Sequence, residues 1–168
     1  MDLETFRAQS NRVVSLARRD LRALWDRLPA DPAAARDVLL EAIPALTEKY
    51  GELAALLAAD LFERLEGRTA ILVSGAARRE IEDRVRFGVG PLWEGKGAQV
   101  LGFMAWITDQ YVKQHGRNTM SVSSARAGLV LVRVPSGSDT CSWCRSLAGT
   151  SDERYHGDCD CVPVPLRD

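Results

Sequence analysis

The sequence has no long apolar run, no excess of either charge, and very little lysine or histidine. Nowhere do about 18 consecutive residues lack a charged side chain, which excludes a membrane-spanning helix. The 22 basic and 23 acidic side chains give a net charge of −1, which excludes a strongly basic nucleic-acid coat and an acidic tail. The N-terminal Met-Asp-Leu-Glu has no secretory-signal core. We therefore expect a soluble intracellular protein, or one released by lysis.

Cysteine is absent from the first 140 residues, and all four cysteines lie between positions 141 and 161. A chain of 168 residues with 46% hydrophobic residues is typical of one globular domain, or of one domain with a small appendage. The clustered cysteines indicate that the appendage is at the C-terminal end. We predict a helical body over residues 1–128 and a C-terminal unit over residues 129–168.

Apolar residues recur at helical spacing through most of the helical body. The pattern predicts about five helices, over residues 2–28, 32–66, 75–87, 98–114 and 118–126. Asp31 is placed to cap the second helix and Gly67 to close it. Pro44 is expected to bend or divide that helix, because proline removes a backbone donor. His115 and Gly116 are expected to end the fourth helix.

The periodicity changes near residue 129. Residues 129–135 (Leu-Val-Leu-Val-Arg-Val-Pro) are β-branched and apolar, which predicts a strand. Residues 161–165 (Cys-Val-Pro-Val-Pro) can form a short edge strand, where the missing donors of the prolines face outward. The expected fold is mainly α, an elongated helical body that carries a small β-hairpin with a zinc site.

The zinc prediction rests on five side chains: Cys141, Cys144, His156, Cys159 and Cys161. Two cysteines in a C-x-x-C turn can chelate one metal ion, and a second pair from a neighbouring hairpin completes a tetrahedron. Two alternatives remain open, a pair of disulfides or four unligated thiols. The lack of a secretory signal argues against disulfides, which persist in oxidising compartments.

Five candidates compete for four zinc ligand positions. Cys159 and Cys161 would point to opposite faces of a regular strand, so both can bind one metal only if the backbone turns between them. Otherwise His156 supplies the fourth ligand. A site closed by four protein ligands is structural, because no position remains for a reactive water. Trp143, between two candidate ligands, is expected to pack over the metal turn.

Several stretches of the sequence are similar to one known family. They are Arg133-Val-Pro, Thr140-Cys-Ser-Trp-Cys144, Tyr155-His-Gly-Asp-Cys-Asp-Cys161, Asp31-Pro-Ala-Ala-Ala-Arg-Asp, Pro44-Ala-Leu-Thr-Glu-Lys-Tyr-Gly51 and Gly116-Arg-Asn-Thr-Met120. Together they resemble the MuF-like minor head proteins of tailed bacteriophages, in the variety common in phages of actinobacteria. The cysteine–histidine ending is the most specific part of this resemblance.

The resemblance implies a non-enzymatic minor capsid protein of head morphogenesis. Such a protein would assemble in the bacterial host cytoplasm and reside in the virion, in the capsid interior near the portal. Its partners would be the portal protein and the capsid interior, and it would aid head assembly or DNA packaging and ejection. No membrane or small-molecule substrate is expected.

An enzyme is the first alternative, because some relatives are labelled capsid maturation proteases. The chain has only two histidines, His115 and His156. We assign the second to metal binding, and the first to the end of a helix, where an imidazolium favours the helix dipole. Ser74 is interpreted as a helix cap rather than a nucleophile. We therefore predict no catalytic residues.

A free-standing zinc-knuckle protein that binds nucleic acid is the second alternative. Lys113, Arg117, Arg126 and Arg133 suggest a modest basic stripe between the helical body and the C-terminal unit. Such a stripe could make weak contact with DNA phosphates or with an acidic portal surface. A solvated helix face is the simpler interpretation of the same residues.

Overall fold

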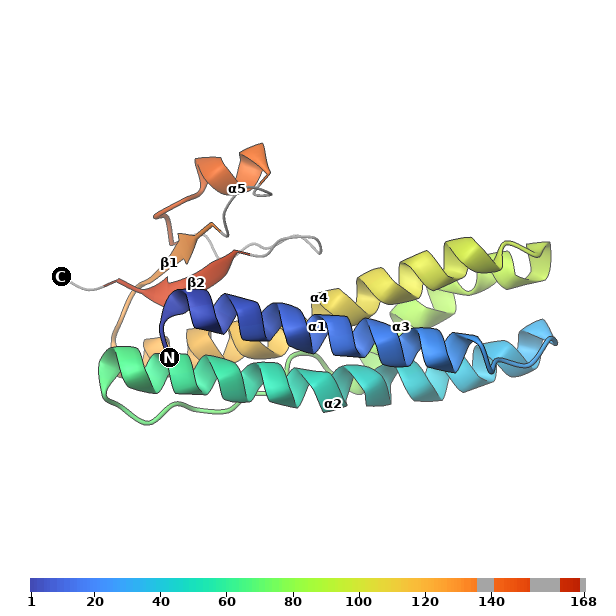
Figure 1. Cartoon of the computed structure of the whole chain (residues 1–168), viewed down its shortest axis with the longest axis horizontal. Coiled ribbons are helices and arrows are strands. Elements are labelled where there is room, and N and C mark those ends of the chain that lie inside the picture. The colour runs from blue at the N-terminus through green and yellow to red at the C-terminus, as the bar shows by residue number, and fades with distance from the viewer. Residues whose placement is uncertain (136–140, 152–160, 167–168) are drawn as a thin grey trace.

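The structure is a computed structural model that describes residues 1–135, 141–151 and 161–166. Figure 1 shows an elongated bundle whose three long helices run along the molecule: α1 (Leu3–Trp25), α2 (Pro32–Glu66) and α4 (Gly97–Ala127). The shorter helices are α3 (Arg78–Gly88), the 3-10 helix η1 (Gly90–Glu94) and α5 (Ser142–Ser146). Strands β1 (Leu131–Val134) and β2 (Val162–Pro165) form an antiparallel pair. The expectation of a mainly helical protein with a small C-terminal sheet is confirmed.

Helix α2 has the ends that its sequence predicts. The Asp31 side chain accepts a hydrogen bond from the backbone N–H of Ala34 at 2.8 Å, which satisfies a donor that the first turn leaves unpaired. Gly67 ends the helix in the left-handed conformation, with φ of 64°, which glycine adopts without a Cβ penalty. The predicted division at Pro44 is wrong, because α2 continues through this buried proline.

Helix α4 is also longer than predicted, because His115 and Gly116 lie inside it and do not end it. A Cβ atom at Gly116 would lie 3.0 Å from the carbonyl oxygen of Ala54. The glycine therefore lets α4 and α2 approach closely, as glycine does where backbones meet. The two helices predicted over residues 98–114 and 118–126 are one continuous helix.

The segment before α3 differs from prediction as well. Ser74 does not cap α3, which begins after Ala77 without a side-chain cap. Residues 70–75 instead run beside α4, whose side chains bond their backbone. These bonds join Ile71 N–H to Ser123 Oγ at 2.8 Å, Val73 N–H to Thr119 Oγ1 at 3.2 Å, and the Gly75 carbonyl to Asn118 Nδ2 at 2.8 Å.

Among the described residues, the large apolar side chains form three clusters that follow one another along the bundle. The first lies near α3 and includes Leu39, Ile43, Val85, Met104 and Ile107. The middle cluster joins α1, α2 and α4 and includes Val13, Ala17, Tyr50 and Val112. The third contains Phe6, Leu61, Phe62, Met120, Leu131 and Val162. The two strands thus contribute side chains to the third cluster, together with the long helices.

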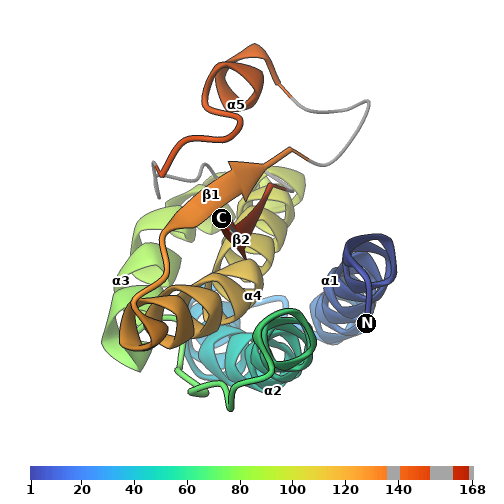
Figure 2. The same cartoon turned by 90° about the vertical axis from the view of Figure 1, so that its left-hand side faces the viewer.

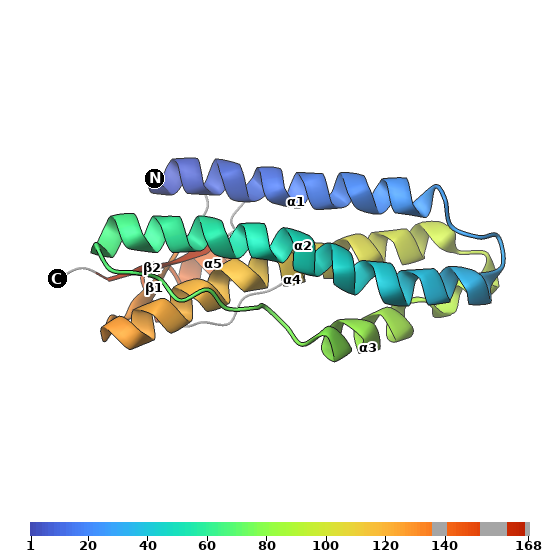
Figure 3. The same cartoon turned by 90° about the horizontal axis from the view of Figure 1, so that it is seen from below.

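The sheet lies at the end of the bundle where α1 begins, as Figures 1 and 2 show. Figure 3 shows α3 nearer the opposite end, below α2. Arg133 pairs with Pro163 and Leu131 with Pro165 across the sheet. The backbone N–H of Arg133 points away from β2 and donates to the Thr150 carbonyl at 3.0 Å. The opposing prolines therefore face the outer edge of β2, where a missing donor breaks no ladder bond.

Candidate functional site

The first feature of the candidate metal site is the turn that carries Cys141 and Cys144. Cys141 is the N-cap of α5, and its sulfur accepts a hydrogen bond from the backbone N–H of Cys144 at 3.3 Å. This bond is the main reason that the pKa of the Cys141 thiol is lowered from its ordinary value, and the charge of Arg133 adds a smaller effect. Both interactions favour the thiolate, which is the form that binds metal ions.

Cys144 and Cys161 come from different parts of the chain and pack against each other. Both are buried, at 1% and 4% exposure, and together they form a small cluster of their own. Arg133 extends from β1 to this cluster and its Nη1 donates to Cys144 Sγ at 3.7 Å. The Arg133 guanidinium also lies over the Trp143 ring, 5.0 Å from its centroid. A buried cation therefore stands directly beside the thiols.

Of the five predicted ligands, the structure thus places Cys141 and Cys144 in one turn and packs Cys161 against Cys144. No disulfide joins these three cysteines to one another. His156 and Cys159 lie outside the described residues. Within residues 1–135, 141–151 and 161–166, no three His, Cys, Asp or Glu side chains form a group that could hold a metal ion. The choice of four ligands from five stays a prediction.

The donor chemistry of the three described cysteines nevertheless fits a thiophilic ion such as Zn²⁺. Zinc prefers thiolate and imidazole ligands in a closed tetrahedral site. The C-x-x-C turn of Cys141 and Cys144 places an N–H···S bond inside the chelating loop. Buried Cys161 reaches the same turn from the start of β2. His156 or Cys159 would have to supply the remaining ligand.

His115 does not occupy the helix end that the sequence predicted. It is 4% exposed in the middle of α4, and its Nδ1 lies 2.8 Å from the Tyr111 carbonyl oxygen. A Cβ atom at Gly51 would lie 2.4 Å from this ring, and one at Gly75 would lie 2.3 Å from it. The imidazole therefore fills a slot between two glycines. This slot is a packing arrangement, and the sequence offered no signal for it.

The four basic residues of the predicted stripe do not share one solvated face. Arg117 and Arg133 are buried, at 7% and 1% exposure. Lys113 is half-buried, and only Arg126 is exposed. Arg133 belongs to the cysteine cluster, whereas Lys113 and Arg117 line a groove described below.

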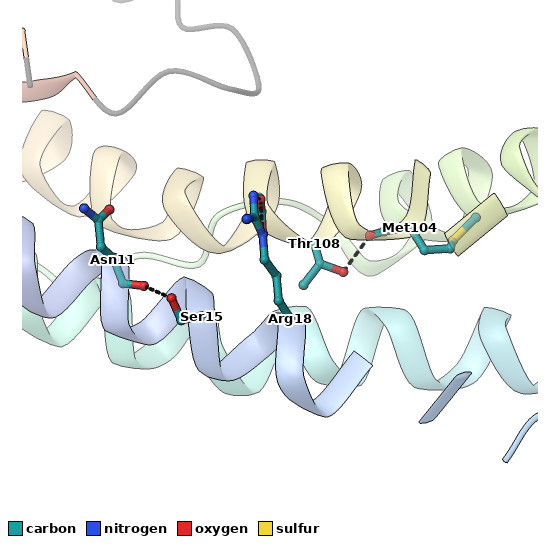
Figure 4. A network of polar contacts seen from close by, with 6 residues as sticks. Asn11, Ser15, Arg18, Met104 and Thr108 are labelled. Carbon is teal, nitrogen blue, oxygen red and sulfur yellow. Dashed lines mark hydrogen bonds and ion pairs between the residues drawn. The ribbon is translucent and has the colours of Figure 1, made fainter. Parts of the chain in front are cut away.

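Sequence reasoning missed an ion pair between α1 and α4. Arg18 Nε donates to Asp109 Oδ2 at 2.8 Å, and the Arg18 Nη2 donates to the same oxygen. Figure 4 shows Arg18 reaching from α1 across to α4, beside Thr108. Asp109 is 4% exposed, so this pair anchors the middle of α1 to α4. The partners are 91 residues apart in the chain, and no local pattern connects them.

A groove of about 250 Å³ lies between α1, α4 and β2. Ala54 and Ala58 of α2 line it with small side chains, and Gly116 of α4 lines it with its backbone. The larger apolar residues in its lining are Phe6, Val14, Val112, Met120, Val162 and Pro163. Arg7, Lys113 and Arg117 supply positive charge, and Cys161 also lines the groove. The groove thus borders the cysteine cluster.

Comparison with known proteins gives one family. A family model described as VG15 protein matches residues 1–168, and it represents a family of phage viral-gene proteins. No curated protein and no solved structure matches the chain. The phage origin implied by the resemblance is therefore confirmed. No helix in the described part of the chain is long and apolar enough to cross a membrane.

Proposed function

Since this chain belongs to the VG15 family of phage proteins, we propose that it is a non-enzymatic minor capsid protein of the MuF-like kind. In this proposal it acts in head morphogenesis, in association with the portal inside the procapsid. It aids head assembly or the packaging and ejection of DNA. The virion, and the host cytoplasm where heads assemble, are its locations.

The observation that carries this proposal is an aromatic ledge, formed by Phe87, Phe103 and Trp106. Phe87 is 80% exposed at the end of α3, and its ring centroid is 6.1 Å from that of Phe103. Phe103 in turn stacks on Trp106 with 5.7 Å between centroids. Phe103 and Trp106 are half-buried, so Phe87 is the exposed ring of this cluster. A large exposed aromatic side chain beside other rings is typical of a surface that another protein covers. A head component that docks on the portal needs such a surface.

The Phe103 ring of the ledge packs against Gly88. A Cβ atom at Gly88 would lie 2.0 Å from the Phe103 ring, so this ring rests directly on the glycine backbone. Gly88 thus lets the Phe103 ring lie against the end of α3, next to Phe87.

The non-enzymatic part of the proposal is supported by the surroundings of His115. Its ring is enclosed by Gly51 and Gly75 and bonded to the Tyr111 carbonyl. A general base must be within hydrogen-bond reach of a substrate proton, and this imidazole is packed in the helical bundle. The alternative functions are a capsid maturation protease and a zinc-knuckle protein that binds nucleic acid. Gene deletion and cross-linking distinguish them from the proposed function.

The zinc is proposed to be structural. Four ligands drawn from Cys141, Cys144, His156, Cys159 and Cys161 would hold it, and the ion would tie the C-x-x-C turn to β2. In this arrangement the bound metal supplies a cross-link and no reactive water. The support is the N–H···S bond at Cys141 and the contact of Cys144 with Cys161. Metal analysis of anaerobically purified protein should find about one equivalent of zinc.

Phage heads assembled with Phe87→Asp protein test the proposed function. We expect the amount of this protein in purified heads to fall about tenfold, which corresponds to a loss of about 1.4 kcal/mol in docking. Leu72→Asp is the matched control, because Leu72 is 56% exposed but lies outside the ledge. Circular dichroism of both purified variants should show unchanged helix content. Normal incorporation of Phe87→Asp protein would contradict docking through the ledge.

Deletion of the gene separates the proposal from the two rival functions. We expect normal processing of the major capsid protein in the deletion strain, together with fewer or defective heads. Uncut capsid protein in that strain would identify a maturation protease. Cross-linking in assembling heads should join this chain to portal protein. Recovery of nucleic acid alone, lost steeply with added salt, would favour the zinc-knuckle binder.

A further inference from the structure

The two sulfur atoms of the C-x-x-C turn each accept an N–H hydrogen bond, but from different kinds of donor. Cys141 Sγ accepts from the backbone N–H of Cys144 at 3.3 Å. Cys144 Sγ accepts from Nη1 of Arg133 at 3.7 Å. The turn itself supplies the first donor, whereas the second comes from strand β1. Arg133 therefore does for Cys144 what the backbone of the turn does for Cys141.

The backbone of Arg133 is fixed to the segment that follows α5. Its N–H donates to the Thr150 carbonyl at 3.0 Å, and its carbonyl accepts from the Gly149 N–H at 2.9 Å. Two bonds exchanged by one residue in this way resemble the pairing of neighbouring strands. They hold β1 beside the segment that carries Cys144. The guanidinium thus starts from a fixed backbone position and reaches the sulfur from there.

The burial of Arg133 indicates that its charge is used. By volume it is the largest of the described residues with less than 2% exposure. Its guanidinium lies over the Trp143 ring, 5.0 Å from the centroid. An unbranched apolar side chain could fill the same space without the cost of removing a charge from water. The guanidinium adds a charged N–H donor, whose hydrogen bond is strongest when the acceptor is an anion.

From this arrangement we propose that Arg133 is a positioning residue for metal binding, which holds the Cys144 sulfur in place and stabilises it as the thiolate. The inference rests on the structural zinc of the proposed function. A thiol that coordinates a metal ion is deprotonated, so the bond from Arg133 becomes charge-assisted on both sides when the site is filled. Cys141 needs no such residue, because the backbone N–H of Cys144 already bonds its sulfur.

Competition with a chromogenic chelator measures the zinc affinity of the full chain. Arg133→Met keeps an unbranched side chain but has no N–H donor, so we expect the affinity to fall at least about tenfold, as for other outer partners of metal ligands. Arg133→Lys retains a charged donor, and it should bind zinc more tightly than Arg133→Met. Arg126→Met is the matched control, since Arg126 is exposed on α4, and it should leave the affinity unchanged.

Cobalt(II) in place of zinc reports on the sulfur atoms directly. Thiolate ligands give Co²⁺ a sulfur-to-metal charge-transfer absorption, and a hydrogen bond to the sulfur raises the energy of this band because it stabilises the negative charge there. In Co²⁺-saturated protein the band of Arg133→Met should therefore lie at longer wavelength than that of the unsubstituted protein. A purely structural loss would not move the band of the saturated site. Circular dichroism should show unchanged helix content in all three variants.

The outcomes separate this inference from the proposed function. If the unsubstituted protein binds one equivalent of zinc, but Arg133→Met keeps its affinity and its Co²⁺ band, the role of Arg133 is overturned and the structural zinc stands. Equal losses of affinity in Arg133→Met and Arg133→Lys, with an unmoved Co²⁺ band, would assign Arg133 a packing role and overturn the inference as well. An unsubstituted protein that binds no zinc would overturn both, whereas docking through Phe87 is measured independently of the metal.

Discussion

The helical body and the C-terminal unit bury different kinds of side chain. In the helical body the large side chains with the least exposure are apolar, such as Phe62, Leu61 and Met104, each at 1% or less. In the C-terminal unit Arg133 and Cys144 are buried to the same degree, at 1% each. Apolar burial stabilises a fold directly, whereas a buried cation or thiol needs partners. The two regions therefore depend on different chemistry for their stability.

The two strands contact both the apolar core and the cysteine cluster. Leu131 and Val162 pack in the same apolar cluster as Phe6 and Leu61 of the helical body. Arg133, between them in the sheet, points its side chain to Cys144 and Trp143. The small sheet thus contacts the apolar core through Leu131 and Val162 and the cysteine cluster through Arg133. Substitutions in the apolar core and in the cysteine cluster should have separable effects.

The largest effect is expected in the apolar core of the helical body. Phe62→Ala removes a ring that is 1% exposed, so it should lower the free energy of unfolding by about 3–5 kcal/mol. Urea denaturation followed by circular dichroism measures this change. Leu56→Ala is the control on the same helix, since Leu56 is 52% exposed and its loss should cost less than about 0.5 kcal/mol. Similar losses for both variants would contradict an apolar core at this point.

A second pair of substitutions tests the packing of His115. Gly51→Ala places a methyl group 2.4 Å from the imidazole, so overpacking should destabilise the protein by about 1–3 kcal/mol. Gly102→Ala is the matched control in α4, because nothing lies within 4 Å of its Cβ position. That change should stabilise the helix by about 0.5–1 kcal/mol. A stabilising Gly51→Ala would show that the slot around His115 is open.

Local sequence signals predicted the helical body well wherever one residue decides a helix end. Asp31 and Gly67 bound α2 as expected, because capping and the left-handed conformation depend on single residues. The same reasoning failed at Gly116, where the glycine serves a contact with Ala54 of another helix. It also failed at Ser74, because α3 starts later. A glycine or serine that ends or caps a helix has the same sequence neighbourhood as one that contacts another helix. Only the tertiary structure distinguishes these two roles.

For the candidate site, the spacing of Cys141 and Cys144 predicted a chelating turn, and the structure shows an N–H···S bond within it. The contribution of Arg133 was not predicted. In sequence it was one of four cations in a stripe, whereas in the structure it is buried beside Cys144. The groove was also missed, since its walls come from α1, α4 and β2, which are far apart in the chain. The spacing of two cysteines predicts that they can chelate a metal ion together. It does not predict which residues from distant parts of the chain lie beside them.

A smaller effect should appear in the pH dependence of the helical body. Tyr50, Arg19 and Lys49 bond the Asp20 carboxylate and hold its pKa at about 2, below the usual value of 3.8. The stabilisation is therefore present above pH 3.8 and is lost as the pH falls towards 2. Because Asp20 is 27% exposed, solvent screening limits its contribution to less than about 1 kcal/mol.

Asp20→Asn measures this contribution. Thermal unfolding should show a lower midpoint than the unchanged protein at pH 6, and the difference should shrink as the pH approaches 2. Asp37→Asn serves as the control, because that carboxylate pairs with Arg36 and is 64% exposed. A midpoint difference for Asp20→Asn that stays constant from pH 6 to pH 2 would contradict the role of its carboxylate.

The smallest effect on the helical body is expected from Cys144→Ser, although this change should remove most of the zinc that we propose this protein binds. The buried Cys144 contacts Cys161 and receives a hydrogen bond from Arg133, and none of these residues belongs to α1, α2 or α4. The unfolding free energy of the helices should therefore change by less than about 0.5 kcal/mol. Trypsin cleavage after Arg145, which is exposed on α5, should become faster.

A comparison of helical unfolding with the rate of trypsin cleavage tests whether the helical body and the C-terminal unit are stabilised independently. Loss of zinc with rapid cleavage at Arg145, but an unchanged helical transition, would show that the metal orders the C-terminal unit alone. Ser142→Ala, an exposed neighbour in the same turn, should retain the zinc and the original cleavage rate. If Cys144→Ser lowered the helical transition as much as Phe62→Ala, the two regions would be one cooperative unit. The shared packing of Leu131 and Val162 with Phe6 would then transmit metal binding to the whole bundle.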